Sequence, residues 1–301
     1  MRKIVLAGGT GQLGSLLKDA FVRWGWEVVI LTRQPARQEG AVRYVQWDGE
    51  HQGPWVGALA GADTLINLSG QRIQCRFTAK NRALLSDSRL LPTQALGQAL
   101  AACTQAPRLW INFSGISLFS GLAQLQDESS QALGTDFLAT LTQQWERSFK
   151  AFSGLATQGV LLRVSPVLSR ASGLLAELLP LAKWGLGGKV GHGKQYVSWI
   201  HEQDLLALLQ WIIEHPQPHT VYHACSPCPS SNAQFMQALR KAVGISFGLP
   251  LPRPLAHVGA FLKGVDPGLL LQSVPAIAVR APQEGFQYRY ASLEKALSDL
   301  V

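Results

Sequence analysis

Apolar positions along this chain switch between short continuous runs and helical spacing. KIVLA, residues 3–7, is a continuous apolar run that stops at glycines, as expected of a buried parallel strand. After it, apolar residues recur three and four positions apart before Gly25, a typical C-cap: Leu13, Leu16, Leu17, Ala20, Phe21 and Trp24. EVVILTR, residues 27–33, is a second apolar run. The pattern predicts a strand, a glycine loop, a helix and a strand in succession.

The same alternation continues as far as residue 168. Further strands are predicted at 42–47, 63–70, 109–115 and 160–168, and helices at 78–103 and 134–152. Strands alternating with helices predict an α/β fold with a Rossmann-type, doubly wound parallel sheet covered on both faces. We therefore assign residues 1–168 to a dinucleotide-binding domain.

The pattern loosens after residue 168. The segment 185–193 holds five glycines in nine residues, which is typical of a loop that shapes a ligand site. Residues 195–229 are predicted to return to the sheet through YVSWI, a helix and VYHAC. The remaining segments, 169–194 and 230–301, are assigned to a smaller, discontinuous C-terminal region that binds substrate.

The glycine loop GGTGQLG, residues 8–14, carries the first chemical signal. Gly8, Gly11 and Gly14 follow a GxxGxxG spacing. Gly8 permits a tight turn, Gly11 lets the backbone approach a pyrophosphate, and Gly14 allows close packing of the helix. Free N–H groups at the start of the helix then face the phosphates. The alternative is a tight turn with no ligand.

The end of the second strand distinguishes the two nicotinamide dinucleotides. An acidic residue there would bind the ribose 2′-hydroxyl of NAD. This strand ends instead in Thr32 and Arg33, with Arg37 nearby. A guanidinium without a carboxylate favours the 2′-phosphate, so the predicted cofactor is NADP. The alternative is that Arg33 only caps a surface loop.

Composition and charge narrow the class of protein. The chain has 301 residues, 47% of them hydrophobic, and a formal net charge of +8. Its basic residues are scattered rather than clustered. This favours a solvated basic surface, with a few arginines that bind a phosphorylated ligand, and disfavours nucleic-acid binding. No apolar run approaches the roughly 18 residues of a membrane span, and the first run is too short for a signal peptide. We expect a cytoplasmic protein without a membrane partner.

The four cysteines are not expected to form a disulfide framework. Cys225 and Cys228, in CSPC, have a spacing seen in redox sites and in half of a zinc site, but no second ligand pair lies nearby in the sequence. Structural or incidental thiols are therefore favoured, and no metal site is predicted.

At this point the chain resembles the extended short-chain dehydrogenase/reductase superfamily over essentially its whole length. The matching motifs include GGTGQLG, DTLINLSG and the strand of Arg163. INLSGQRI, the Ser88-Arg89 pair, WERS, GLGGKVGHGKQYVSWIHEQDL and GFQYRYASLEKALSDL are similar to one atypical branch, the bacterial "epimerase family proteins", which resemble NAD-dependent epimerases and dehydratases.

The resemblance implies a set of cofactor contacts. In addition to the three glycines, it places Thr10, Gln12 and Leu13 at the pyrophosphate. It places Thr32 and Arg33 at the adenosine ribose phosphate and Asp48 at the adenine. The remaining implied contacts are Leu68, Ser69 and Gly70 beneath the cofactor and Ser165 and Val167 near the nicotinamide.

The resemblance breaks at the catalytic residues. Active superfamily members use a Tyr as the acid/base and a Lys four residues later that lowers its pKa. Counting from Trp145 and Glu146, these positions hold Leu138 and Thr142. The atypical branch commonly lacks this pair, and a Tyr-Tyr-Gly after the fifth strand is a plausible replacement. Here that triplet is Leu118-Phe119-Ser120, so neither arrangement is present.

The remaining candidates are a few polar and aromatic residues. Ser114 is a candidate carbonyl donor, and His201 is an acid/base by residue type, with a structural role as its alternative. Arg89 and Arg163 are candidate clamps for a substrate carboxylate or phosphate, or else form internal ion pairs. Trp199 is a candidate substrate contact, with packing as its alternative.

The sequence therefore leaves two main functions open. One is an NADP(H)-dependent oxidoreductase or nucleoside-diphosphate-sugar epimerase acting on an unidentified small molecule, in which the cofactor transfers hydride. The other is a catalytically impaired NADP(H)-binding protein that senses redox state or binds a partner. A homodimer is a further expectation, because dimers are common in the superfamily.

Overall fold

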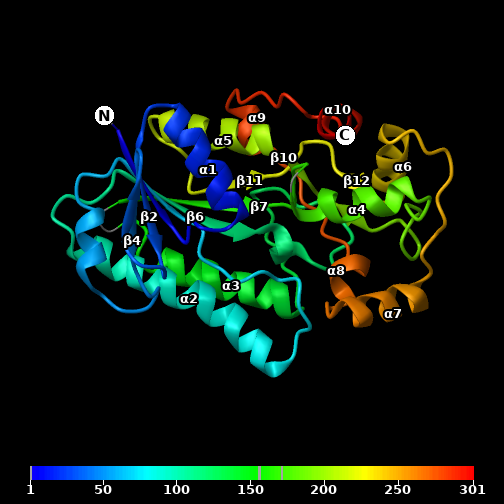
Figure 1. Ribbon diagram of the computed structural model, residues 1–301, viewed down its shortest axis with the longest axis horizontal. Coiled ribbons are helices and arrows are strands. Elements are labelled where there is room, and N and C mark those ends of the chain that lie inside the picture. The colour runs from blue at the N-terminus through cyan, green and yellow to red at the C-terminus, as the bar shows by residue number, and fades with distance from the viewer. Residues whose placement is uncertain (1, 155–156, 171) are drawn as a thin grey trace.

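The computed structural model describes residues 2–154, 157–170 and 172–301. At its centre lies an eight-stranded sheet in which all neighbours are parallel except β3 and β4 (Figure 1). In spatial order the strands are β11 (Val221–Ala224), β7 (Gln158–Val164), β6 (Leu109–Gly115), β5 (Thr64–Asn67), β1 (Lys3–Ala7), β2 (Glu27–Thr32), β4 (Val42–Gln46) and β3 (Arg37–Glu39). Chain order reverses between β1 and β5, which makes this junction the switch point where ligands bind in such sheets.

Helices cover both faces of the sheet, so its central strands are apolar on both sides. On one face Ile4 and Leu6 of β1 pack with α1 (Gln12–Arg23), α5 (Glu202–Glu214) and α9 (Arg280–Gln283). On the other face Val5 and Ala7 pack with α2 (Ala79–Ala102), α3 (Phe137–Lys150) and the short η1 (Pro54–Ala58). Figure 1 shows α1, α5 and α9 above the sheet and α2 and α3 below it. The fold is the doubly wound α/β architecture that the alternation of runs predicted.

A smaller lobe lies beyond the carboxyl ends of the strands. Its core joins α4 (Gly173–Lys183), α6 (Asn232–Ala242) and α10 (Leu293–Leu300), and α7 (Arg253–Lys263) and α8 (Gly268–Leu271) lie outside this core. Two small sheets pair β8 (Val167–Leu168) with β10 (Ile200–His201) and β9 (Tyr196–Val197) with β12 (Ser230–Ser231). The glycine-rich segment is held against residues 247–251, because Leu249 N donates to Gly185 O at 2.8 Å and Gly191 N donates to Leu251 O at 2.8 Å.

The structure differs from the predicted elements in three places. YVSWI does not return to the main sheet, because it is split into β9 and β10, which pair within the two small sheets. The run 160–168 is not one strand: β7 ends at Val164, and β8 resumes at Val167 in a different sheet, after Pro166. The polar β3 was not predicted, because all of its residues are exposed and it carries no apolar signal.

The predicted division of the chain remains a prediction. Strand β11 and helix α5 pack with the main sheet. So do Ala281 and Phe286, which come from the segment assigned to the smaller region. Within the described residues, no helix is long and apolar enough to span a membrane, and no cluster of three potential metal ligands occurs.

Candidate functional site

The carboxyl ends of the parallel strands bring the predicted cofactor contacts to one edge of the sheet. Residues 8–14 follow β1, Arg33 follows β2, and Asp48 follows β4. Leu68, Ser69 and Gly70 follow β5, Ser114 lies near the end of β6, and Ser165 and Val167 follow β7. The edge carries loops that are separated by up to 160 residues in sequence, which is why no local pattern reveals the whole site.

The three glycines of the loop have different physical roles. Gly8 has φ +72°, and a Cβ there would lie 2.9 Å from both Cα and Oγ of Ser69. At Gly14 a Cβ would lie 2.2 Å from the Gly9 carbonyl oxygen, so only glycine allows α1 to pack this closely. Gly11 is the N-cap of α1, no side chain caps the helix there, and a Cβ would meet no described atom within 4 Å. Two glycines therefore serve packing, while Gly11 borders open space at the helix N-terminus.

The end of β2 presents an exposed cation, Arg33. Arg33 is exposed, and no ion pair joins it to a residue that the structure describes. By contrast, Arg37 lies in β3, where it pairs with Glu39 at 2.6 Å and stacks 3.7 Å from the centre of the Tyr44 ring. Thr32 is buried, and its hydroxyl accepts from Gln34 N at 3.2 Å. Of the two arginines near this strand end, only Arg33 is available to a ligand.

Asp48 is exposed in the loop after β4. Its Oδ1 accepts from the backbone N–H groups of Glu50 and His51 at 2.9 Å, and its Oδ2 lies 2.8 Å from His51 Nδ1. These hydrogen bonds, led by the one from Glu50 N, lower the pKa of Asp48 to about 2. The carboxylate is therefore ionised at neutral pH and orders its own loop.

A buried asparagine pair, which the sequence analysis missed, joins the end of β5 to the middle of β6. Asn67 Nδ2 donates to Asn112 Oδ1 at 2.7 Å and to Thr93 Oγ1 at 3.1 Å, while Asn67 Oδ1 accepts from Ser69 N at 3.0 Å. The sequence signal for this pair is the two similar pentapeptides INLSG and INFSG. Their asparagines lie opposite each other in the register of β5 and β6. The pair fixes the loop of Ser69 beside the glycine loop.

Ser114 and Arg163 meet at a single buried carboxylate. Arg163 forms two parallel hydrogen bonds to Glu146, Nε to Oε1 and Nη2 to Oε2, both at 2.8 Å. Ser114 Oγ donates to the same Oε1 at 2.9 Å. The geometry favours the internal ion pair as the role of Arg163, because its guanidinium is buried and committed to Glu146.

A buried histidine extends this network. His223 Nε2 lies 3.4 Å from Arg163 Nη1, and His223 Nδ1 lies 3.0 Å from the Ile277 carbonyl oxygen. Glu128, also buried, accepts from His223 N and from the N–H groups of Val279 and Arg280. Burial lowers the pKa of His223 to about 4, so the ring is neutral at pH 7.

The positions where the superfamily has its acid/base pair are buried on α3. Leu138 has no titratable group, and the Thr142 hydroxyl donates to the Leu138 carbonyl at 2.7 Å and lies 2.9 Å from Ser117 Oγ. The triplet 118–120 is also buried, with Phe119 packed against both His223 and Arg163. None of these side chains has an ionisable group that could serve as a general acid or base at neutral pH.

His201 and Trp199 lie inside the C-terminal lobe. His201 has no exposed surface; its Nδ1 accepts from Gln203 N at 3.1 Å, which caps α5, and its ring stacks 3.8 Å from Tyr290. Its Nε2 lies 3.3 Å from Asp299 Oδ2 without hydrogen-bond alignment. Burial lowers the pKa of His201. Trp199 is likewise fully buried, so geometry favours the structural roles of both residues.

Arg89 is a half-buried cation beside the site. Its Nη2 donates to the Gln71 carbonyl at 3.0 Å and its Nη1 to the Leu85 carbonyl at 2.9 Å. Its Cζ would lie 3.2 Å from a Cβ at Gly70, directly against the loop after β5. Burial lowers the pKa of Arg89 to about 10, which still leaves it charged at pH 7. Within the described chain no carboxylate pairs with it, unlike Arg163.

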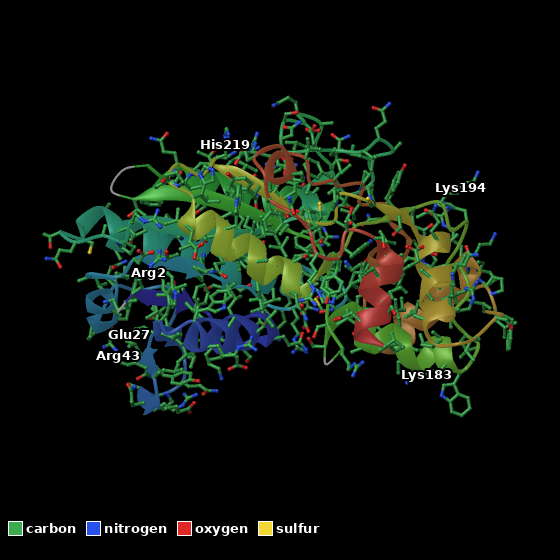
Figure 2. The ribbon with its side chains drawn as sticks, turned by 90° about the horizontal axis from the view of Figure 1, so that it is seen from above. Arg2, Glu27, Arg43, Lys183, Lys194 and His219 are labelled. Atoms are coloured by element: carbon green, nitrogen blue, oxygen red, sulfur yellow. The ribbon has the colours of Figure 1, made fainter. Side chains whose placement is uncertain are left out.

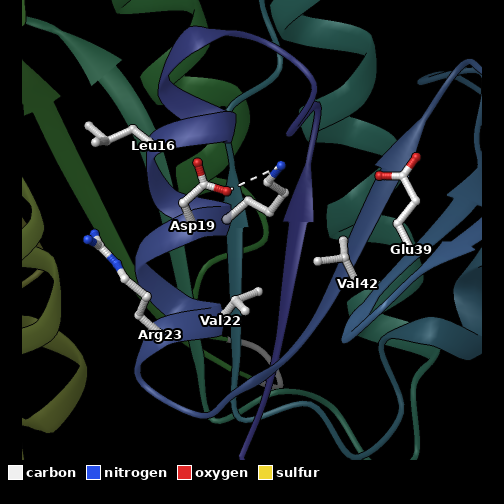
Figure 3. Close-up of a pocket in the computed structure, with 7 residues that line it drawn as sticks. Leu16, Asp19, Val22, Arg23, Glu39 and Val42 are labelled. Atoms are coloured by element: carbon white, nitrogen blue, oxygen red, sulfur yellow. Dashed lines mark ion pairs between the residues drawn. The ribbon is translucent and has the colours of Figure 1, made fainter.

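A surface depression elsewhere is separate from this edge. It encloses about 490 Å³ between α1 and the β3–β4 hairpin and is lined by Leu16, Lys18, Asp19, Val22, Arg23, Glu39 and Val42 (Figure 3). Its lining comes from the middle and end of α1 rather than from the glycine loop. None of the predicted cofactor contacts borders it.

Comparison with known proteins gives a consistent assignment. No protein-family model matches the chain. The human epimerase family protein SDR39U1 is 30% identical over 303 residues, covering 99% of both chains. The Mycobacterium bovis epimerase family protein Mb2239 is 33% identical over 298 residues, covering 98% of this chain and 96% of that protein.

The fold comparison agrees. The crystal structure of human SDR39U1 isoform 2 with NADPH superposes with a TM-score of 0.87 at 28% identity, covering 99% of this chain and 98% of that one. The shared fold and the full-length sequence matches confirm the predicted resemblance. This chain therefore belongs to the epimerase family of SDR39U1 and Mb2239, which has the short-chain dehydrogenase/reductase fold.

Proposed function

We propose that this protein binds NADPH across the carboxyl edge of its sheet and exchanges hydride between the cofactor and a small polar carbonyl or sugar substrate. The observation that carries the proposal is that the glycines of the loop have different surroundings. Gly8 and Gly14 are packed against backbone, while Gly11 borders open space at the uncapped N-terminus of α1. An uncapped helix N-terminus of this kind favours a phosphate. The human relative, whose crystal structure contains NADPH, supports the same cofactor.

Arg33 supports NADPH over NADH. It is exposed at the end of β2, no ion pair to a described residue occupies it, and Thr32 precedes it where NAD-binding chains carry a carboxylate. A guanidinium pairs with a 2′-phosphate through two parallel hydrogen bonds, which a 2′-hydroxyl cannot match.

The chain's own residues would position the reacting groups. The nicotinamide supplies or accepts the hydride when the cofactor is bound. The Asn67–Asn112 pair holds the loop of Ser69 in place beneath the cofactor. Ser114 donates its hydrogen to Glu146, so it polarises a substrate carbonyl only if the hydroxyl rotates away from that carboxylate.

Arg89 is the group we propose for binding an anionic part of the substrate. It is charged at pH 7 and it contacts the loop after β5. Its three hydrogen-bond acceptors, the Leu85 and Gln71 carbonyls and Ser88 Oγ, are all neutral. A carboxylate or a phosphate would provide the opposite charge that the protein itself does not place there. Arg163 is not proposed for this role, because Glu146 already neutralises it.

A second candidate function is NADPH binding without turnover. It rests on the burial of Leu138 and Thr142 at the superfamily's acid/base positions and on the complete burial of His201. In such a protein the bound cofactor would report redox state or stabilise a conformation recognised by a partner.

Titration with NADPH and NADH, followed by nicotinamide fluorescence, tests cofactor binding. Preferential NADPH binding supports the proposal, and failure to bind either cofactor refutes both candidate functions. A panel of carbonyl and sugar compounds then separates them by cofactor oxidation. The first function is supported if turnover falls in Ser114→Ala and KM rises in Arg89→Met. The second function is supported if the protein binds NADPH tightly but turns over no compound of the panel.

A further inference from the structure

The outer end of the C-terminal lobe exposes large apolar side chains. Trp184 is 81% exposed and Leu262 is 78% exposed. We define the apolar patch as these two residues together with Leu181, Leu186, Phe247 and Leu249, all of which are exposed. A contiguous exposed apolar patch on a globular chain marks an interaction surface.

Several contacts bring the members of the patch together. Leu249 N donates to Gly185 O, and Gly188 N donates to Leu249 O at 3.2 Å, which sets Leu249 beside Trp184 and Leu186. A Cβ at Gly185 would lie 2.7 Å from the Phe247 ring, so that ring covers the same segment. On α4, Glu177, Leu181 and Trp184 follow one another at helical spacing and share a face. Lys263 pairs with Glu177 at 3.5 Å and thereby places the end of α7, with Leu262, beside that face.

Helix α7 has the pattern of an amphipathic helix whose apolar side is uncovered. Only Ala256 and Ala260 are buried in it. Leu255, Val258 and Leu262 recur at helical spacing, and all three are exposed. The helix therefore packs on the lobe through two small residues and turns its larger apolar residues to solvent.

The charge around the patch is predominantly basic, because Glu177 on the α4 face is paired with Lys263. Residues 178–201 contain three lysines and residues 215–265 contain four Lys or Arg, and neither stretch contains an Asp or Glu. Lys183, Lys189, Lys194 and Arg253 are exposed among them. Figure 2 shows Lys183 and Lys194 at the same end of the molecule, opposite Arg2 and Arg43. Two copies of this chain would bring like charges together if they met through this end, which disfavours the patch as a dimer interface.

We propose that the apolar patch docks on the surface of an anionic phospholipid bilayer. Tryptophan and aliphatic side chains enter the interfacial region, while lysine and arginine beside them are attracted to acidic headgroups. The contact is peripheral and needs no membrane-spanning helix. The proposal concerns the outer lobe and does not depend on cofactor binding at the sheet edge.

Co-sedimentation of the full chain with vesicles tests this proposal. Vesicles of phosphatidylcholine alone are compared with an equal mixture of phosphatidylcholine and phosphatidylglycerol. We expect binding to the mixed vesicles only, weakening as salt is raised. Lys183→Glu/Arg253→Glu should lower partitioning by about tenfold or more, because each reversal turns an attraction into a repulsion. Trp184→Ser/Leu262→Ser should lower it by a similar factor through lost apolar burial.

Two matched controls keep the test specific. Arg43→Glu makes, at the opposite end, the single charge reversal that the test variant makes at each of its two positions, and Leu125→Ser removes an exposed leucine outside the patch. Both variants should bind vesicles like the unaltered chain. Urea unfolding of every variant shows that its fold is intact. Absence of vesicle binding, equal binding to neutral vesicles, or a dimer that Trp184→Ser/Leu262→Ser dissociates in sedimentation equilibrium would each overturn the proposal.

Discussion

Replacing Gly11 with Asp separates cofactor binding from folding more sharply than any other single change. A Cβ at Gly11 meets no described atom within 4 Å, and φ of −81° suits any residue. Asp is also a good N-cap, so stability without cofactor should be unchanged or a few tenths of a kcal/mol higher. A carboxylate about 4 Å from a pyrophosphate, at an effective dielectric of about 20, repels it by about 4 kcal/mol. This corresponds to a loss of about a thousandfold in NADPH affinity.

Two variants calibrate this experiment. Gly11→Ala adds only a methyl group to the pyrophosphate space, so it should weaken NADPH binding by less than Gly11→Asp. Gly14→Ala places a Cβ 2.2 Å from the Gly9 carbonyl and should lower the free energy of unfolding by about 2 kcal/mol or more. Fluorescence titration measures affinity, and urea unfolding without cofactor measures stability. The reasoning is refuted if Gly11→Asp binds NADPH within threefold of the unaltered chain, or is destabilised as much as Gly14→Ala.

Three other predictions concern the ribose phosphate, the buried ion pair and the buried histidine. Arg33→Ala should weaken NADPH binding by about tenfold and leave NADH binding unchanged, as parallel titrations would show; equal losses for both cofactors would contradict the 2′-phosphate contact. Glu146→Gln should lower the free energy of unfolding by about 3 kcal/mol in urea, because it leaves the buried Arg163 uncompensated, and Glu146→Gln/Arg163→Met should recover part of that loss. Since burial holds the pKa of His223 at about 4, below its unfolded value of about 6.5, its contribution to stability is complete above pH 6.5 and is lost as pH falls toward 4. The free energy of unfolding should fall by up to about 1.4 kcal/mol per pH unit in that window. If its dependence on pH is unchanged in His223→Gln, groups other than His223 cause the effect.

The parts of the fold that the sequence predicted are those with a strong apolar signal. The strands formed by the runs near 3–7 and 27–32 are buried on both faces, so composition alone indicates central parallel strands. The two-residue strands of the C-terminal lobe are too short to show any periodicity, and β3 is polar throughout. Their positions depend on the packing of distant segments.

The candidate site, too, was predictable from the sequence only where its signal is local. The glycine loop is local, so its spacing and context predicted where it lies. The role of Arg163 depends on whether α3 places Glu146 against β7, which no local pattern specifies. The burial of His201 likewise depends on Tyr290, which is 89 residues away in sequence. Residue type suggested chemistry at both positions, whereas the tertiary contacts favour structural roles.

The packing of the segment near Phe286 has a consequence for the order in which the protein is made. Ala281 and Phe286 lie in the same core as Ile4 and Leu6, although a ribosome adds them some 280 residues later. The side of this core formed by β11 and Trp211 therefore lacks part of its apolar cover until the late segment is made, because α9 packs on β11 and Phe286 packs on Trp211. During synthesis this face of the nascent sheet stays exposed and favours chaperone binding. Completion of the fold must then follow translation of that segment.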